Sequence, residues 1–307
     1  MIAIIKIRKI WYTFSALAFI AAIVATILWG LNFGIDFTGG GLMEVSFTEQ
    51  RPTHQAVTDA LVSIGLNNTS IQPVGDQGLI LRFKDVDEET HQKILTTLEE
   101  AFDKNTDGSD RGTFEEKKFS SIGPIMGQEL KTKTIWALIL ANIAIIIYVG
   151  LAFRKVSRPV ASWKYGVIAV IALIHDVFIT VGFFAFFGHF YGIEINAPFI
   201  AALLTILGFS VHDTIVVFDR TRENLTKQHG EDFEAIVEKS VNQTITRSIN
   251  TSLTVLLTLF SIMIFGGPTI RDFVLALIIG VTFGTYSSIF VASPLLVTWE
   301  RFSAKKS

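Results

Sequence analysis

Half of the 307 residues are apolar, 26 residues are phenylalanine, and only 18% are charged. This composition excludes an ordinary soluble domain and indicates an integral membrane protein. The chain has no cysteine, so disulfides and thiolate metal sites are excluded as well.

A membrane-spanning helix needs about 20 mostly apolar residues. Six segments meet this requirement: residues 10–31, 134–153, 165–187, 197–218, 248–266 and 273–298. The sequence therefore predicts an α-helical polytopic membrane protein with six transmembrane helices. The expected division is residues 1–31 for the N-terminus and helix 1, 32–133 for an outer domain, 134–300 for helices 2–6, and 301–307 for a tail.

The distribution of lysine and arginine predicts the orientation of the chain. Basic residues gather at both termini and in two loops, whereas the short loops 188–196 and 267–272 hold only Arg271. Both termini are therefore expected in the cytoplasm and residues 32–133 outside. That outer segment carries 17 acidic and 10 basic side chains, which argues against nucleic acid as a ligand.

The outer segment predicts an α+β ferredoxin-like domain. Alternating apolar residues predict strands at 41–48, 69–74, 78–83 and 114–122, and helical spacing predicts one helix after the first strand and one after the third. The order β-α-β-β-α-β is the ferredoxin-like arrangement. We expect a hairpin turn at 75–77 and a mobile polar tip at 105–112.

The segment GIDFTGGG, residues 34–41, has the glycine content of a phosphate-binding loop. It lacks the Gly-Lys-Ser/Thr ending that holds a nucleotide. We interpret it as a flexible exit from the first span into the first strand.

Two of the predicted spans contain a His-Asp pair, His175-Asp176 and His212-Asp213. An ionised side chain near the bilayer centre costs about 2.5 kcal/mol or more. Because Asp213 is too short to reach water from two turns deep, it must be protonated, paired or in a wet cavity. A purely structural ion pair with Arg247 remains an alternative, and we interpret His175 as a hydrogen-bonded core histidine.

The fifth span carries a stripe of polar residues. On a helical wheel they lie within about 60° of one direction: Arg247, Asn250, Thr251, Thr254, Thr258 and Ser261. We expect this stripe to face protein or a water path and not lipid. Two alternatives remain: the hydroxyl groups can bond to carbonyls of their own helix, and Arg247 can extend to the cytoplasmic interface.

The sixth span has small residues at every fourth position, among them Gly280 and Gly284. Such a face lets another helix backbone approach closely. We expect these glycines to serve helix packing, and the face to suit a related half-protein.

Several motifs in order along the chain resemble one family. They are G-I-D-F-T-G-G (34–40), I-H-D-V (174–177), D-T-I-V-V-F-D-R-T-R-E-N (213–224), F-G-G-P (265–268) and S-S-I-F-V-A-S (287–293). Together with six spans and a large outer domain after the first, they are similar to the SecF family. Its members are the smaller partners of SecD in bacterial protein export and resemble half of a resistance-nodulation-division transporter.

This resemblance implies a multi-pass protein of the bacterial inner membrane that couples the proton-motive force to late steps of polypeptide translocation. The family's intramembrane Asp and Arg correspond to Asp213 and Arg247. We group His212 and Asp176 with them as a candidate proton relay, and Asn250, Thr251 and Thr254 as a polar pathway. His212 stands where the family usually has Asn.

The expected partners are a SecD-like subunit, the SecYEG translocon with YajC as a further candidate, the translocating polypeptide and membrane lipid. No cofactor is expected. The coupling ion is H⁺, with Na⁺ as the alternative.

Two other classes of protein remain open at this point. A half-transporter of an ion-driven efflux pump would use the same relay. An intramembrane hydrolase would need a nucleophile or metal, but the sequence has no H-E-x-x-H motif, no G-x-S-x-G motif and no cysteine. We therefore do not expect an enzyme.

Overall fold

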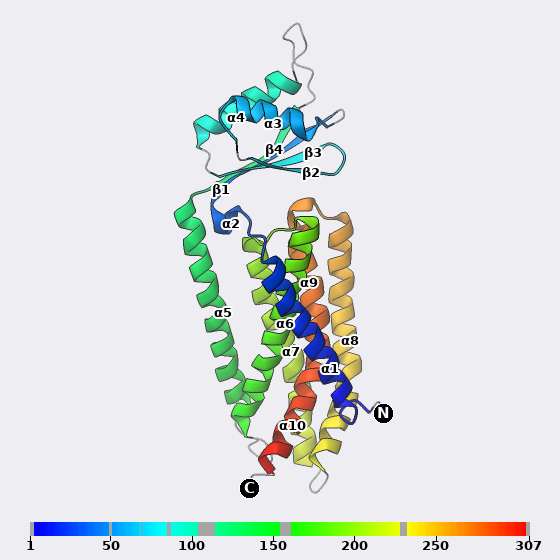
Figure 1. Cartoon of the computed structure of the whole chain (residues 1–307). Coiled ribbons are helices and arrows are strands. Elements are labelled where there is room, and N and C mark those ends of the chain that lie inside the picture. Colours follow the sequence, from blue (N-terminus) through cyan, green and yellow to red (C-terminus); the bar gives the residue numbers. More distant parts are fainter. Residues whose placement is uncertain are drawn as a thin grey trace. The chain divides into compact units, whose positions relative to one another are not determined.

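The computed structural model describes residues 3–48, 51–67, 69–84, 87–103, 114–153, 161–227 and 232–304. The chain divides into two compact units, residues 1–32 with 134–307 and residues 33–133 (Figure 1). The tip predicted at 105–112 lies outside the described residues, as do the basic residues Arg154, Lys155, Arg158, Lys305 and Lys306.

The first unit contains six helices, among the described residues, that are long and apolar enough to cross a membrane. The spans are α1 (Arg8–Trp29), α5 (Pro124–Ala152), α6 (Ser162–Tyr191), α7 (Ala197–Lys227), α8 (Phe233–Phe265) and a sixth composed of α9 (Pro268–Ser287), the π-helical turn η1 (Ser288–Ala292) and α10 (Ser293–Ala304). This confirms the predicted membrane class.

Every span after the first is longer than its apolar segment predicts, because hydropathy marks only the part of a helix that suits hydrocarbon. Helix α7 continues past residue 218 through polar residues that pair on its own surface. Asp219 bonds Arg222 at 2.6 Å, and Arg220 bonds Glu223 at 2.5 Å. This agrees with the solvated, internally paired helix end that the charge pattern indicates.

Small residues bring the helices of this unit close together. A Cβ atom on Gly182 of α6 would lie 2.4 Å from the Cα atom of Ala22 in α1, so the two backbones touch. In contrast, α5 lies at the edge of the bundle with mostly exposed side chains (Figure 1). Arg8 and Arg301 both bond Glu234 at the start of α8, which places the start of α1 and the end of α10 on the same side.

The second unit has the predicted ferredoxin-like fold. Its elements are α2 (Ile35–Thr38), β1 (Gly40–Phe47), α3 (His54–Ser63), β2 (Ser70–Val74), β3 (Gly78–Phe83), α4 (Glu88–Phe102) and β4 (Phe114–Ile122). The antiparallel sheet has the order β2-β3-β1-β4, and α3 and α4 cover one face (Figure 1). Fully buried Met43, Val45, Leu61, Leu81 and Leu98 form the core between them.

The GIDFTGGG segment is ordered, so the predicted flexible exit is wrong. Residues 35–38 form the short helix α2 with Phe37 buried, and β1 starts directly after it. Gly40 has a φ of +118°, and a Cβ atom there would lie 2.4 Å from the Phe83 carbonyl oxygen. Only glycine combines this dihedral with so close an approach.

Candidate functional site

Asp176 lies in α6, is completely buried and is surrounded by hydrogen-bond donors. Ser210 of α7 and Ser287 of α9 donate to its Oδ2 atom at 2.6 Å and 2.7 Å. His175 Nδ1 lies 2.9 Å from Oδ1. Through these contacts one buried carboxyl group joins three spans, α6, α7 and α9.

The sixth span changes from α-helix to π-helix where it meets this network. The π-helical turn starts at Ser288, whose Oγ atom lies 2.9 Å from Thr214 Oγ1 of α7. A π-helical turn shifts the register of a helix and occurs often at functional sites. Here the π-helical turn lies at two adjacent serines: Ser287 bonds Asp176, and Ser288 bonds Thr214.

Asp213 lies one turn after Ser210 on α7 and is also buried. Its polar neighbours are the hydroxyl groups of Ser248 in α8 and Ser288. Among the described residues, neither Asp213 Oδ2 nor Ser248 Oγ has a hydrogen-bond partner. Buried polar atoms in proteins are nearly always satisfied, which singles out this pair as a candidate site.

Arg247 does not reach Asp213 in this chain. It is exposed on α8, and no ion pair joins it to Asp213 in the described part of the structure. The structural ion pair that the sequence leaves open is therefore absent. Ser248, the next residue, points inward instead and takes the position beside Asp213.

The remaining polar residues of the prediction lie on the surface of the first unit. His212 is exposed on α7, and Asn250, Thr251 and Thr254 are exposed on α8. Thr254 donates to the Thr251 carbonyl oxygen at 2.8 Å, as the alternative of bonding within the same helix predicts. The stripe is therefore not covered by any helix that the structure describes.

Gly280 and Gly284 pack against α7 of the same chain. A Cβ atom on Gly280 would lie 2.2 Å from Ile206 Cδ1, and one on Gly284 would lie 3.0 Å from Ser210 Cβ. Within this chain, therefore, the small-residue face of α9 is in contact with α7. The close contact at Gly284 also brings α9 near enough for Ser287 and Ser210 to share Asp176.

Sequence reasoning missed the serines around the two carboxyl groups: Ser210, Ser248, Ser287 and Ser288. Isolated serines in apolar spans carry no periodic signal. The adjacent pair Ser287-Ser288 in the S-S-I-F-V-A-S motif was the one available indication.

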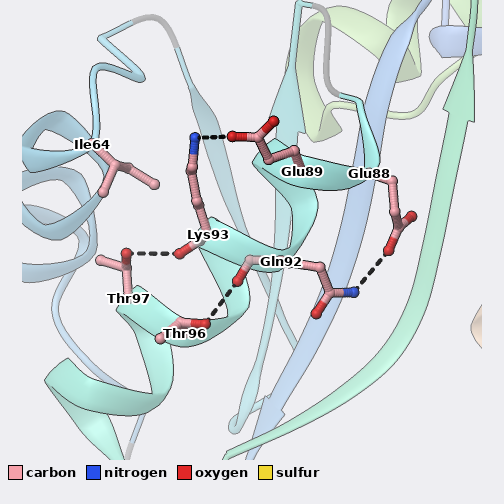
Figure 2. A pocket seen from close by; sticks show the side chains of 7 residues that line it. All are labelled: Ile64, Glu88, Glu89, Gln92, Lys93, Thr96 and Thr97. Atoms are coloured by element: carbon pink, nitrogen blue, oxygen red, sulfur yellow. Dashed lines mark hydrogen bonds and ion pairs between the residues drawn. The ribbon is translucent and has the colours of Figure 1, made fainter.

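The second unit has a hollow of about 480 Å³ on the surface of α4, beside Ile64. Figure 2 shows that its polar side chains are directed at one another, with Lys93 bonding Glu89 at 2.6 Å and Gln92 bonding Glu88 at 2.7 Å. We assign no chemistry to this hollow.

Comparisons with known proteins identify the family. The model of the C-terminal part of protein export membrane proteins SecD/SecF matches residues 101–302, and the SecD/SecF GG motif matches residues 30–50. The chain is 44% identical to the protein translocase subunit SecF of Thermobaculum terrenum, over 98% of this chain and 94% of that one.

The chain also resembles one part of longer proteins. It is 35% identical to the protein translocase subunit SecDF of Bacillus subtilis, over 97% of this chain and 38% of that one. The crystal structure of SecDF, a translocon-associated membrane protein, from Thermus thermophilus matches with a TM-score of 0.79 and 31% identity, again over 97% and 38% of the two chains. The chain therefore belongs to the SecD/SecF family of protein export membrane proteins.

Proposed function

We propose that this chain is a SecF-type subunit of a protein translocase that uses the proton-motive force to assist late translocation of polypeptides across the cytoplasmic membrane. Relatives named protein translocase subunit SecF support the translocase role. The observation that supports ion coupling is the buried carboxyl group of Asp213, which lies in a candidate span. Its Oδ2 atom has no hydrogen-bond partner among the described residues. Such a group can hold a proton inside the membrane.

Arg247 supplies the second state of the switch. Successive residues of a helix point about 100° apart. A rotation of α8 about its own axis by this angle would therefore replace Ser248 by Arg247 beside Asp213. A nearby cation favours the carboxylate. Asp213 therefore releases its proton when Arg247 approaches and binds one when Arg247 leaves. A charge that crosses the bilayer is worth about 2.3 kcal/mol per 100 mV.

Asp176 has a different role in this proposal. Its carboxyl group already accepts from Ser210 and Ser287 and contacts His175 Nδ1, so its oxygens are occupied by partners within the bundle. It is suited to anchor α6, α7 and α9 around the relay, whereas Asp213 is suited to exchange the proton.

The proposed contact with a SecD-like subunit is formed by exposed residues of α7 and α8. The fused SecDF relatives support such a partner. On α7 the face consists of small or polar residues, Ala201, Thr205, Gly208 and His212, and on α8 it is the stripe that starts at Arg247. SecYEG, YajC and the translocating polypeptide are proposed partners of the assembled complex.

The test is reconstitution of the chain with its SecD-like partner in vesicles, with export and internal pH recorded together. Asp213→Asn keeps the size of the side chain but removes the titrating group, so export per assembled complex should be lost while the amount of complex is unchanged. Arg247→Met should also abolish coupling. Normal export from Asp213→Asn would disprove the relay. Proton movement without export would favour the efflux half-transporter. Export that depends on Na⁺ would show that the coupling ion is Na⁺ and not H⁺.

The proposed orientation places both termini in the cytoplasm. A reporter enzyme that is active only in the periplasm should be active when fused at Asn105 and inactive when fused at Lys305. The reverse pattern would overturn this topology.

A further inference from the structure

The first residues of the described chain dock onto the cytoplasmic ends of other helices in the proposed orientation. Ile4 and Ile5 are completely buried. They belong to the same apolar cluster as Phe233 and Val237 of α8 and Val297 of α10. Two fully buried isoleucines fix the segment in place, because exposing each would cost the transfer of its side chain to water.

Glu238 of α8 binds the backbone of this segment directly. The amide groups of Ile4, Ile5 and Lys6 donate to its carboxylate at 2.7, 2.9 and 3.3 Å. Amide groups at the beginning of a helical turn have no acceptor within the turn, and a negative charge is favourable there. Glu238 therefore caps the start of the turn that leads into α1, from a different helix.

These bonds differ from an ordinary surface ion pair. Each amide is fixed in direction by the backbone, so the carboxylate is held by three donors at one position. A second contact lies one turn earlier on α8, where Glu234 bonds Arg8 at 3.0 Å. Together they attach the start of α1 to the part of α8 that precedes the relay.

The two attached helices have separate tasks in the proposed function. Helix α1 continues through α2 into β1 of the outer unit, and α8 carries Arg247 about two and a half turns after Glu238. A turn of α8 around its axis must therefore either break the Glu238 bonds or move α1 with it.

We infer that Glu238 is a positioning residue, which joins α8 to α1 through the amides of residues 4–6 and thereby couples the placement of Arg247 to the helix that leads into the outer unit. This inference rests on the proposed function of Arg247, but the attachment itself can be measured independently.

The chain has no cysteine, so spin labels can be attached at Lys6→Cys and Ala235→Cys, two exposed positions on the joined segments. The distance between the labels should show one narrow distribution in the full complex. Glu238→Gln should broaden it, and so should Ile4→Ser, which removes an apolar anchor without touching α8. Glu223→Gln, an equal change of charge on α7 whose partners are side chains, should leave it narrow.

Export should be recorded from the same complexes over a range of pH. A misplaced Arg247 changes the pH at which Asp213 binds its proton. Glu238→Gln should therefore lower export several-fold and shift the pH profile of export, while the amount of complex stays unchanged. Glu238→Asp, which keeps the carboxylate, should restore part of the loss. A purely structural role would lower export by the same factor at every pH.

The inference is overturned if Glu238→Gln keeps the narrow distribution, or if the distribution broadens while the pH profile stays in place. If Glu238→Gln prevents assembly of the complex, the label distance distribution and the pH profile of export are judged on Ile4→Ser by the same criteria. Asp213→Asn, measured in parallel, distinguishes failure of this inference from failure of the proposed function. Full export from Asp213→Asn disproves the relay, independently of the result for Glu238→Gln.

Discussion

At the scale of single residues, the two buried carboxyl groups differ in how completely they are bonded. Asp176 has three donors, whereas Asp213 keeps one oxygen without a partner in the described chain. Both are buried and both follow a histidine in the sequence. The difference in their hydrogen bonding therefore comes from residues of neighbouring helices and not from the local sequence.

Ser287→Ala tests the anchoring role of Asp176. The change removes one hydrogen bond to a buried carboxyl group, and a typical intramolecular hydrogen bond contributes about 0.5–1.5 kcal/mol. The variant should lose its monodisperse form at a lower temperature, as measured by size-exclusion chromatography after heating. Ser261→Ala is the control, because this exposed hydroxyl bonds only a carbonyl of its own helix. Equal stability of the two variants would contradict the anchor.

Asp87 provides a residue-scale prediction in the outer unit. Its carboxylate accepts from the Thr90 amide at 2.9 Å and caps α4. Hydrogen bonds from the Thr90 side chain and then from this amide lower the pKa of Asp87. A lowered pKa means that the stabilisation is complete above the ordinary Asp value of about 3.9 and is lost as pH falls through the folded value.

Asp87→Ala should therefore lower the unfolding temperature of the outer unit at pH 6 in the full chain, and the difference from the parent should shrink toward pH 3. Asp59→Ala, at an exposed position within α3, serves as the control. A difference that is independent of pH would show that the carboxylate is not the cap.

At the scale of elements, the sequence predicted the outer unit well and the interior of the bundle poorly. Period-two alternation along β1 and β3 is a local property, as is the turn at Gly75 between β2 and β3, and each lies within about a residue of its prediction. The π-helical turn at Ser288 depends on contacts with α7, which no local pattern encodes. The burial of Ile4 and Ile5 likewise depends on contacts with other helices, so the basic N-terminal sequence around them does not predict it.

Close helix contacts allow a prediction for α1 and α6. Gly182→Ala places a Cβ atom within 2.4 Å of the backbone of Ala22, and a backbone atom cannot move aside as a side chain does. Overpacking of this kind costs about 1–3 kcal/mol, so the folded fraction in detergent should fall on heating. Gly208→Ala is the matched control, because nothing lies within 4 Å of its added Cβ atom in the described chain.

At the scale of the whole molecule, Gly208 tests the proposed contact with a SecD-like subunit. Gly208→Leu adds a large side chain to the exposed face of α7. The chain alone should remain as stable as the parent, but co-purification of the partner in mild detergent should fall. Thr282→Leu, at an exposed position on α9 away from this face, should leave the partner bound. Undiminished binding by Gly208→Leu would place the partner elsewhere.

The exposed stripe on α8 also bears on how the protein is made in the cell. Arg247 and Asn250 have no partner of their own in the described chain, and hydrocarbon disfavours such groups strongly. In the proposed complex the SecD-like subunit covers this stripe, so a copy synthesised without that subunit would present these polar groups to lipid. The steady-state amount of the chain should therefore follow the supply of the partner subunit, and excess synthesis of one half should be degraded instead of accumulating.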